Sequence, residues 1–275
     1  MAGVVLVLGA GGIRGWAHVG ALEVFHRAGV PVRGLVGASA GSLIAPLYAA
    51  RRDPDEMLRV ALSATPLSLT LWFLDGLRIR REARGFGRLL WGAYGRLNFQ
   101  ELAVPFAAAV LDVATGERLL LREGNVGRAV EASIRPPVLM PPLKLQGRYL
   151  TDGGLQDTLP LALARALYPD APLVGVAVGE FLVLPSGLRP RAAQVALRLR
   201  RRNASPSSVL GQVAFMAHLL AQGRPVRDGQ HLLVSPRLRG IMSALPFRMR
   251  EAIEEGRRVA RRALPELKRL LAEME

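Results

Sequence analysis

Two aliphatic runs near the N-terminal end each lead into a glycine-rich turn and then into a helical pattern. Val4–Leu8 is continuously apolar, as expected for a strand buried on both faces, and Trp16–Arg27 follows with helical spacing. The same order returns with residues 33–37 and residues 40–50. This repeated order predicts an α/β fold in which strands and helices form separate layers.

The rest of the chain continues to alternate between strand-like and helical segments. We expect a hairpin and further strands and helices at residues 106–112 with 118–121, 126–133, 148–151, 159–166, 173–178, 209–221, 231–234 and 247–274. Residues 53–100 are helical and loop-like without a clear strand, and residues 183–208 have the composition of a basic connector. With no internal repeat and no long linker, residues 1–275 are predicted to form one domain.

The net charge of +15 is carried almost entirely by arginine, since Lys144 and Lys268 are the two lysines. Such a bias is typical of genome composition, while a basic surface also suits anionic partners such as lipid headgroups. No nucleic-acid-binding motif accompanies the charge, so nucleic acid is not expected as a partner.

The chain has no cysteine, which excludes disulfides and thiolate metal sites and fits a cytosolic location. Residues 1–8 carry no basic residue ahead of the apolar run, so we interpret them as a buried strand and not as a signal peptide. No apolar window is long enough to span a bilayer. We therefore expect a cytoplasmic protein, with peripheral contact to the inner face of the membrane as a further hypothesis.

The first glycine-rich turn, residues 9–15, has the sequence G-A-G-G-I-R-G. Glycines between a strand and a helix leave backbone N–H groups exposed, and the helix dipole adds positive potential. Such a turn can bind an anion, either a phosphate or the oxyanion of a tetrahedral intermediate. A dinucleotide site is disfavoured, because the G-x-G-x-x-G fingerprint needs glycine where Arg14 stands.

The second turn, residues 37–41, has the sequence G-A-S-A-G between an apolar strand and a helix. This G-x-S-x-G pattern is typical of a nucleophilic serine, because the sharp strand-to-helix turn leaves no room for side chains two residues on either side. The start of the helix also stabilises developing negative charge. The pattern therefore indicates that Ser39 is a nucleophile.

A serine nucleophile needs a base, and the sequence offers few candidates. His18, His26, His218 and His231 lie in helical or strand patterns, where a structural role is more common than catalysis. Asp152 follows the strand at 148–151 and precedes two glycines, so its carboxylate is expected at a strand end. Spacing alone favours a plain surface turn for this Asp-Gly-Gly sequence, and partial desolvation would be required to make the aspartate an effective base.

Taken together, these motifs resemble those of the patatin-like phospholipase family, in particular its compact bacterial members. The G-G-x-R-G motif of that family matches residues 11–15, its G-x-S-x-G matches residues 37–41, and its D-G-G matches residues 152–154. The intervening stretches 18–22, 106–117 and 129–142 are also similar. One departure is residues 156–160, which lack the asparagine that the family often has before the proline.

The resemblance implies a three-layer α/β/α sandwich with a mainly parallel central sheet. It implies a catalytic dyad of Ser39 and Asp152 without histidine, with the backbone N–H groups of Gly11, Gly12 and Ile13 holding the oxyanion. Arg14 would order that loop or meet a phosphate headgroup. No cofactor is implied, and neither is calcium or another metal, because no cluster of oxygen ligands is visible.

The expected function is a serine lipid acyl hydrolase of the phospholipase A or esterase type, acting on a lipid or other acyl ester. Two alternatives stay open: a general carboxylesterase or thioesterase for soluble acyl esters, and a non-catalytic module that binds anionic lipid or nucleotide. Residues 66–96 mix leucine, tryptophan and arginine. This mixture suits either a buried cap over the core or a flap that touches a membrane surface.

Overall fold

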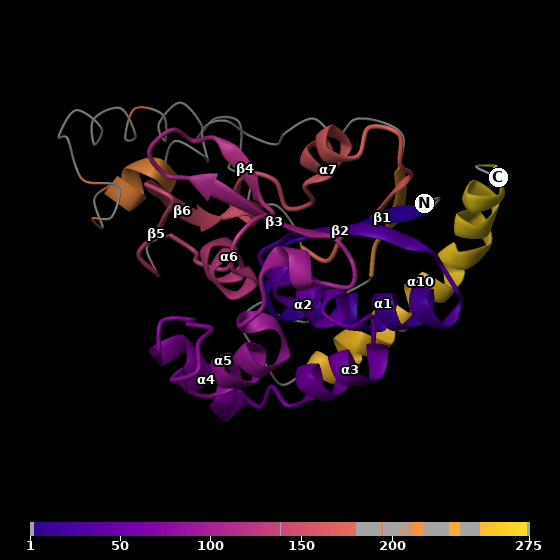
Figure 1. Cartoon of the computed structure of the whole chain (residues 1–275), viewed down its shortest axis with the longest axis horizontal. Coiled ribbons are helices and arrows are strands. Elements are labelled where there is room, and N and C mark those ends of the chain that lie inside the picture. Colours follow the sequence, from indigo (N-terminus) through magenta and orange to yellow (C-terminus); the bar gives the residue numbers. More distant parts are fainter. Residues whose placement is uncertain are drawn as a thin grey trace.

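A computed structural model describes residues 3–137, 139–179, 194, 205, 208, 211–216, 231–236 and 248–273. In this described part a single eight-stranded sheet runs through the molecule, in the order β5-β6-β3-β2-β1-β7-β8, with β4 paired to β3 (Figure 1). The bounds are β1 Val4–Leu8, β2 Val32–Ala38, β3 Phe106–Asp112, β4 Arg118–Leu121, β5 Leu143–Leu145, β6 Arg148–Asp152, β7 Leu173–Val176 and β8 His231–Val234.

The centre of the sheet is parallel and one end is antiparallel. β3, β2, β1, β7 and β8 pair in parallel, whereas β4 and β6 run antiparallel to β3, and β5 runs antiparallel to β6. Parallel strands need crossover helices, and these helices cover the faces of the sheet. The antiparallel end arises from two hairpins. β3 and β4 form the first, and β5 and β6 form the second.

Helices cover both faces of the sheet, so the fold is the three-layer α/β/α sandwich with a mainly parallel sheet that the resemblance implied (Figure 1). One face carries α1 (Trp16–Arg27), α2 (Ala40–Ala49), α6 (Val126–Ser133) and α10 (Met249–Ala272), and the other carries α7 (Leu161–Leu167). Alternate residues of β1 serve the two layers: Leu6 and Leu8 pack under α1 and α2, while Val5 and Val7 pack against α7.

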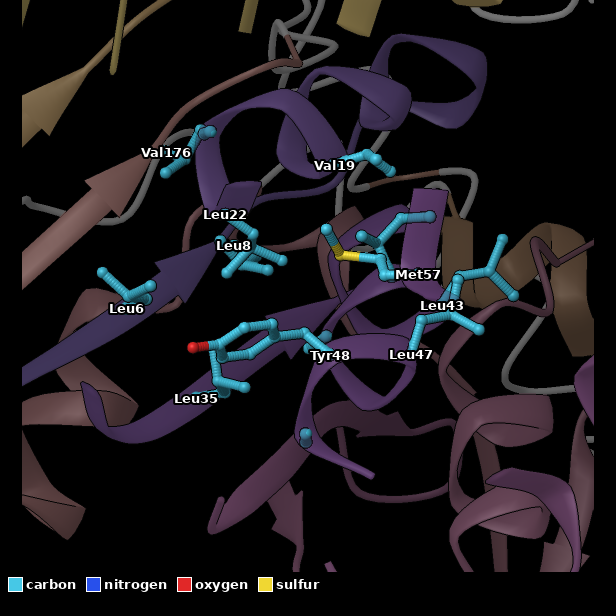
Figure 2. Packing of buried hydrophobic residues seen from close by; sticks show 14 of the residues in the cluster. Leu6, Leu8, Val19, Leu22, Leu35, Leu43, Leu47, Tyr48, Met57 and Val176 are labelled. Carbon is cyan, nitrogen blue, oxygen red and sulfur yellow. The ribbon is translucent and has the colours of Figure 1, made fainter. Parts of the chain in front are cut away.

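The larger core lies between the sheet and the α1–α2 layer (Figure 2). Leu8 of β1 and Leu35 of β2 meet Leu22 of α1 and Tyr48 of α2, and all four are at most 1% exposed. Burial of such side chains contributes roughly 1.5–3 kcal/mol each. The core therefore fixes the two strand ends from which the glycine-rich turns leave.

Residues 53–100 are helical in the structure, as the pattern predicted, and no element of the sheet arises from them. They form α3 (Pro54–Leu62), α4 (Pro66–Leu74), α5 (Phe86–Leu90) and the short turns Trp91–Gly95 and Phe99–Glu101. Within the described ranges no single helix is long and apolar enough to cross a membrane. α3 and α4 reach the required length and composition only as a pair, and the pair is bent by 80°.

Some predicted elements differ from those observed, and some cannot be compared. The strand Leu143–Leu145 was not predicted, because three residues are too few for a pattern. The helix expected at 159–166 begins at Leu161. Residues 211–216 of the helix expected at 209–221 are helical. The remainder of that helix, including His218, and almost all of the predicted connector 183–208 lie outside the described residues.

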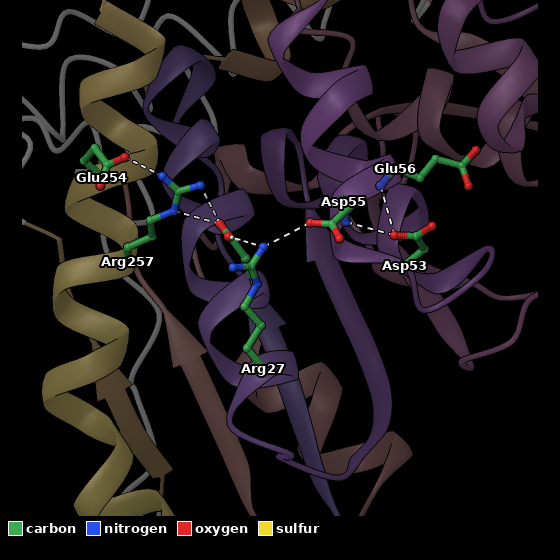
Figure 3. Close-up of polar contacts among 7 residues, drawn as sticks. Arg27, Asp53, Asp55, Glu56, Glu254 and Arg257 are labelled. Atoms are coloured by element: carbon green, nitrogen blue, oxygen red, sulfur yellow. Dashed lines mark hydrogen bonds and ion pairs between the residues drawn. The ribbon is translucent and has the colours of Figure 1, made fainter.

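A series of ion pairs connects α10 to α1 and α3 (Figure 3). The buried carboxylate of Glu23 on α1 accepts from Arg257 of α10 at 2.6 Å and from Arg27 at 3.1 Å. Arg27 continues to Asp55 of α3 at 3.0 Å. The neighbouring Asp53 caps α3 by accepting from the backbone N–H groups of residues 55 and 56.

We expect Arg257→Ala to lower the free energy of unfolding by about 2 kcal/mol or more, because it leaves the carboxylate of Glu23 buried with only the exposed Arg27 as a partner. Urea denaturation followed by circular dichroism measures the loss. Arg248→Ala is the control, since Arg248 pairs with Glu251 at the surface and its removal should cost much less. Equal losses in the two variants would contradict a stabilising role for the buried pair.

Candidate active site

One edge of β3 brings Ser39 and Asp152 together. The first half of this edge pairs in parallel with β2, ending with Ala109 opposite Ala38. The next residue, Val110, pairs with Asp152 at the end of β6, which arrives antiparallel from the opposite direction. β4 occupies the other edge of β3. The two strands therefore meet end to end, and residues 39 and 152 become neighbours although 113 positions separate them.

Ser39 lies at a strained turn between β2 and α2. Its backbone has φ 51° and ψ −117°, a region that L-residues with side chains rarely adopt. The glycines on either side are required by close contacts: a Cβ on Gly41 would lie 2.0 Å from the carbonyl oxygen of Leu8, and one on Gly37 would lie 2.6 Å from Gly41. The sharp turn expected from the G-x-S-x-G pattern is thus present.

The hydroxyl of Ser39 donates a hydrogen bond to Oδ2 of Asp152 over 2.7 Å. The other carboxylate oxygen, Oδ1, accepts from the N–H of Gly154 over 2.8 Å. Asp152 is 8% exposed, and this burial raises the pKa of its carboxyl from 3.8 to about 6, although the bonds from Ser39 and Gly154 partly oppose the rise. The spacing of the Asp-Gly-Gly sequence by itself favoured a surface turn at this position, whereas the structure buries the aspartate and pairs it with the serine.

The turn after β1 lies beside this pair. Gly15 approaches α2 so closely that a Cβ on it would lie 2.3 Å from that of Ala40. The N–H of Arg14 closes the turn on the carbonyl of Gly11 at 3.2 Å. Within the described residues, the N–H groups of Gly11, Gly12 and Ile13 have no backbone acceptor, as is usual for the first residues of a helical turn. The turn with these three N–H groups lies close to Ser39, since a Cβ on Gly154 would lie 2.2 Å from that of Ala10 and 3.5 Å from that of Ser39.

Ser133 and Ser42 also contact this site, although no motif pointed to a role for either of them. The hydroxyl of Ser133, on α6, accepts from the backbone N–H of Ser39 at 3.1 Å and lies 2.7 Å from the carbonyl of Ala109. Ser42 lies 2.8 Å from Ser133 and donates to the carbonyl of Gly37 at 2.7 Å. These contacts hold the strained turn in place. Only the position of Ser42, one helical turn after Ser39, was visible as a signal in the sequence.

The strand that carries Asp152 is tied to the start of the loop after α6. The N–H of Asp152 and the hydroxyl of Thr151 both donate to the carbonyl of Arg135, at 3.1 Å and 2.6 Å. Thr151 and Asp152 are both buried. The aspartate is therefore held by main-chain bonds on one side and by Ser39 and Gly154 on the other.

The described histidine side chains have partners away from Ser39. Nε2 of His18 donates to the carbonyl of Gly9 at 2.8 Å, and burial lowers the pKa of His18 to about 4, so its ring is neutral at pH 7. His26 contacts the hydroxyl of Tyr48 at 3.0 Å. His218 and the side chain of His231 lie outside the described residues. In the part of the chain that the structure covers, no group of three or more acidic or histidine side chains could hold a metal ion.

Comparison with known proteins decides the family. The sequence model of the patatin-like phospholipases matches residues 6–165, which is more than half of the chain and includes both Ser39 and Asp152. The chain belongs to the patatin-like phospholipase family.

Curated relatives agree at the level of the family. An uncharacterized NTE family protein of Mycobacterium tuberculosis is 32% identical over 165 residues, which covers 58% of this chain and 44% of the relative. The neuropathy target esterase sws of Drosophila melanogaster is 29% identical over 183 residues, or 64% of this chain and 13% of the relative. The patatin-like chain thus matches less than half the length of these relatives.

A solved structure supports the fold. The crystal structure of VipD from Legionella pneumophila aligns with 96% of this chain and 67% of its own, with a TM-score of 0.53 at 13% sequence identity. At that identity the likeness concerns the fold alone.

Asp152→Asn is expected to stabilise the fold at neutral pH. The folded-state pKa lies above the unfolded value, so the folded protein holds this proton more tightly and loses stability as the pH rises from about 4 to about 6. Removing the charge should therefore add up to about 3 kcal/mol of unfolding free energy at pH 8, and almost nothing at pH 4. Denaturation at both pH values measures the gain. The exposed Asp170→Asn is the control, and a gain that is absent at pH 8 would contradict the burial of the charge.

Proposed function

We propose that this patatin-like protein is a lipid acyl hydrolase that cleaves fatty acyl esters through a dyad of Ser39 and Asp152. The observation that supports it most strongly is the 2.7 Å hydrogen bond between the serine hydroxyl and the buried carboxylate. A direct hydrogen bond aligns the acceptor with the proton that must leave, and the raised pKa of Asp152 makes it a better base than an exposed aspartate. The identity of the dyad, the oxyanion donors and the substrate are all part of this proposal.

The reaction follows from the positions of these groups. Asp152 takes the hydroxyl proton while Oγ of Ser39 attacks the carbonyl carbon of the ester. The carbonyl oxygen gains negative charge and is held by the N–H groups of Gly11, Gly12 and Ile13, whose loss would typically cost about 3 kcal/mol per donor. The alcohol leaves with the proton from Asp152, and an acyl-serine remains. Water, deprotonated by Asp152, then releases the fatty acid and restores Ser39.

Arg14 has a supporting place in this scheme. Its backbone N–H bonds to the carbonyl of Gly11 and closes the turn that presents the oxyanion donors, so we infer that it orders this loop through its main chain. No cofactor takes part in the proposed steps, because each proton transfer has a donor and an acceptor among the residues named.

The surface of α4 supports a lipid as the source of the ester. Leu67 and Leu74 of this helix are 69% and 74% exposed, and Phe73 is 45% exposed. Exposed arginines follow directly after the helix, at positions 78, 80, 81, 84 and 88. Apolar side chains flanked by cations suit the boundary of an anionic membrane. We infer that α4 rests on the lipid surface from which the substrate comes.

Trp72, one of the two tryptophans in residues 66–96, faces the core and not the lipid side. Trp72 is 4% exposed, packs on Phe86 with ring centroids 5.6 Å apart, and donates to the carbonyl of Arg78 at 2.8 Å. Phe86 in turn packs on Trp16, which directly follows the first glycine-rich turn. The segment thus combines a buried inner face with an exposed apolar outer face, and the leucines, not the tryptophan, are the residues to test.

Ser39→Ala is expected to abolish both labelling by a fluorophosphonate probe and release of fatty acid from phospholipid, because it removes the nucleophile. With wild-type protein and a soluble nitrophenyl ester, the rate should rise as the pH passes about 6 and then level off, as Asp152 loses its proton. Activity that persists in Ser39→Ala would contradict the proposed mechanism. Hydrolysis of short nitrophenyl esters without release of fatty acid from phospholipid would favour the alternative, a carboxylesterase for soluble esters.

Leu67→Ser and Leu74→Ser should each weaken binding to vesicles that contain phosphatidylglycerol by about fivefold to tenfold, since each removes apolar area that would be buried in the interface. Co-sedimentation measures the bound fraction. Leu233→Ser, at an exposed leucine of β8, is the control and should leave binding unchanged. If all three variants bind as the wild type does, α4 does not contact the lipid.

A further inference from the structure

A cavity lies beside α6, on a different side of this helix from the one that faces Ser39. Ser133 points from α6 toward Ser39, whereas Arg128 and Glu131 lie on another side of the same helix and line a cavity of about 550 Å³. The segment that follows α4 and the loop before β5 complete its walls with Arg78, Arg80 and Arg135. A volume of this order suits a small molecule or a lipid headgroup.

The lining of this arginine cavity is strongly cationic. Four guanidinium groups face one carboxylate, that of Glu131. The carboxylate already accepts from the N–H of Ile79 and from Arg128, at 2.5 Å in both cases. Among the described residues the one ion pair of Arg78 is a long one to Asp75, at 3.9 Å, and the exposed Arg80 has none. The positive charges of Arg78 and Arg80 are therefore poorly neutralised by nearby carboxylates.

Arg135 adds a second, independent observation. It is 7% exposed, and its two terminal nitrogens donate to the carbonyls of Pro141 at 3.2 Å and Gly76 at 3.1 Å. Its Nε is buried and has no hydrogen-bond partner. A buried donor without an acceptor costs about 1–3 kcal/mol, and more for a charged group. The guanidinium of Arg135 therefore keeps a positive charge in the wall of the arginine cavity with carbonyl oxygens as its acceptors, and an anion in the cavity would offset that charge.

We propose that the arginine cavity is a binding site for a phosphate group. Arginine presents its N–H groups in a planar fork that matches the oxygens of phosphate, and several forks around one cavity favour a compact, multiply charged anion. The site is separate from the oxyanion turn and does not depend on the proposed hydrolysis. One residue connects the arginine cavity to Asp152, because Arg135 lines the cavity and its carbonyl accepts from the N–H of Asp152.

The test measures phosphate binding with no catalysis in progress. Inorganic phosphate and monomeric dihexanoyl phosphatidylglycerol are titrated separately into the Ser39→Ala protein by calorimetry. The double variant Arg78→Gln/Arg80→Gln is compared with Arg81→Gln/Arg84→Gln, which removes the same charge from the same segment outside the cavity. We expect the first pair to weaken binding at least tenfold and the second pair to change it less than twofold.

The two probes distinguish the sources of the phosphate. Binding of inorganic phosphate that is lost in Arg78→Gln/Arg80→Gln supports a site for a free phosphate compound. Binding of the phospholipid alone, lost in the same variant, supports a headgroup site. Equal weakening by both double variants would mean that the anion is attracted by the overall positive charge of the segment and not by the cavity, and it would overturn the proposal. A failure of both probes to bind would also overturn it. None of these outcomes requires Ser39 or Asp152 to be catalytic, so the proposal can fail independently of the hydrolase.

Discussion

The site depends on one strand edge that serves two partners in succession. β3 pairs with β2 as far as Ala109 and with β6 from Val110 onward, so the end of a parallel strand and the end of an antiparallel strand face each other. The main-chain bonds of a ladder fix this register to within one residue, because a slip by one would turn Asp152 to the other face of the sheet. The contact between Ser39 and Asp152 is therefore a consequence of backbone pairing and not of side-chain flexibility.

This arrangement has a cost in stability that the surrounding structure must offset. Ser39 is held at positive φ, and Asp152 is held in a buried place that opposes its charge. The hydroxyl of Ser133 and the carbonyl of Arg135 satisfy the main chain at these two positions. Behind them, Leu8 and Leu35 anchor the strand ends in the larger core. A strained and desolvated pair persists because rigid neighbours determine its position.

The segment between α3 and β3 packs against this core on one face and is exposed to solvent on the other. Its inner face is continuous with the core through the ring contacts of Trp16, Phe86 and Trp72, and Gly76 accepts from Arg135 near the dyad. Its outer face carries exposed leucines and arginines. The proposed hydrolysis of a lipid requires both properties, since the ester must leave a lipid surface and reach a site from which water is partly excluded.

The sequence alone determined the local features of this protein. The aliphatic runs, the glycine-rich turns and the helical spacing predicted the α/β order, and the glycines around Ser39 predicted the sharp turn on which it lies, because these patterns depend on sterics within a few residues. The tertiary structure decided what depends on distant residues: the short strand β5, the bonds of Ser133 and Arg135, the burial of Trp72 and the raised pKa of Asp152. Asp152 shows the difference most clearly. Its own neighbours are equally typical of a surface turn, and only the pairing of β6 with β3 removes it from water and sets it against a serine 113 positions away.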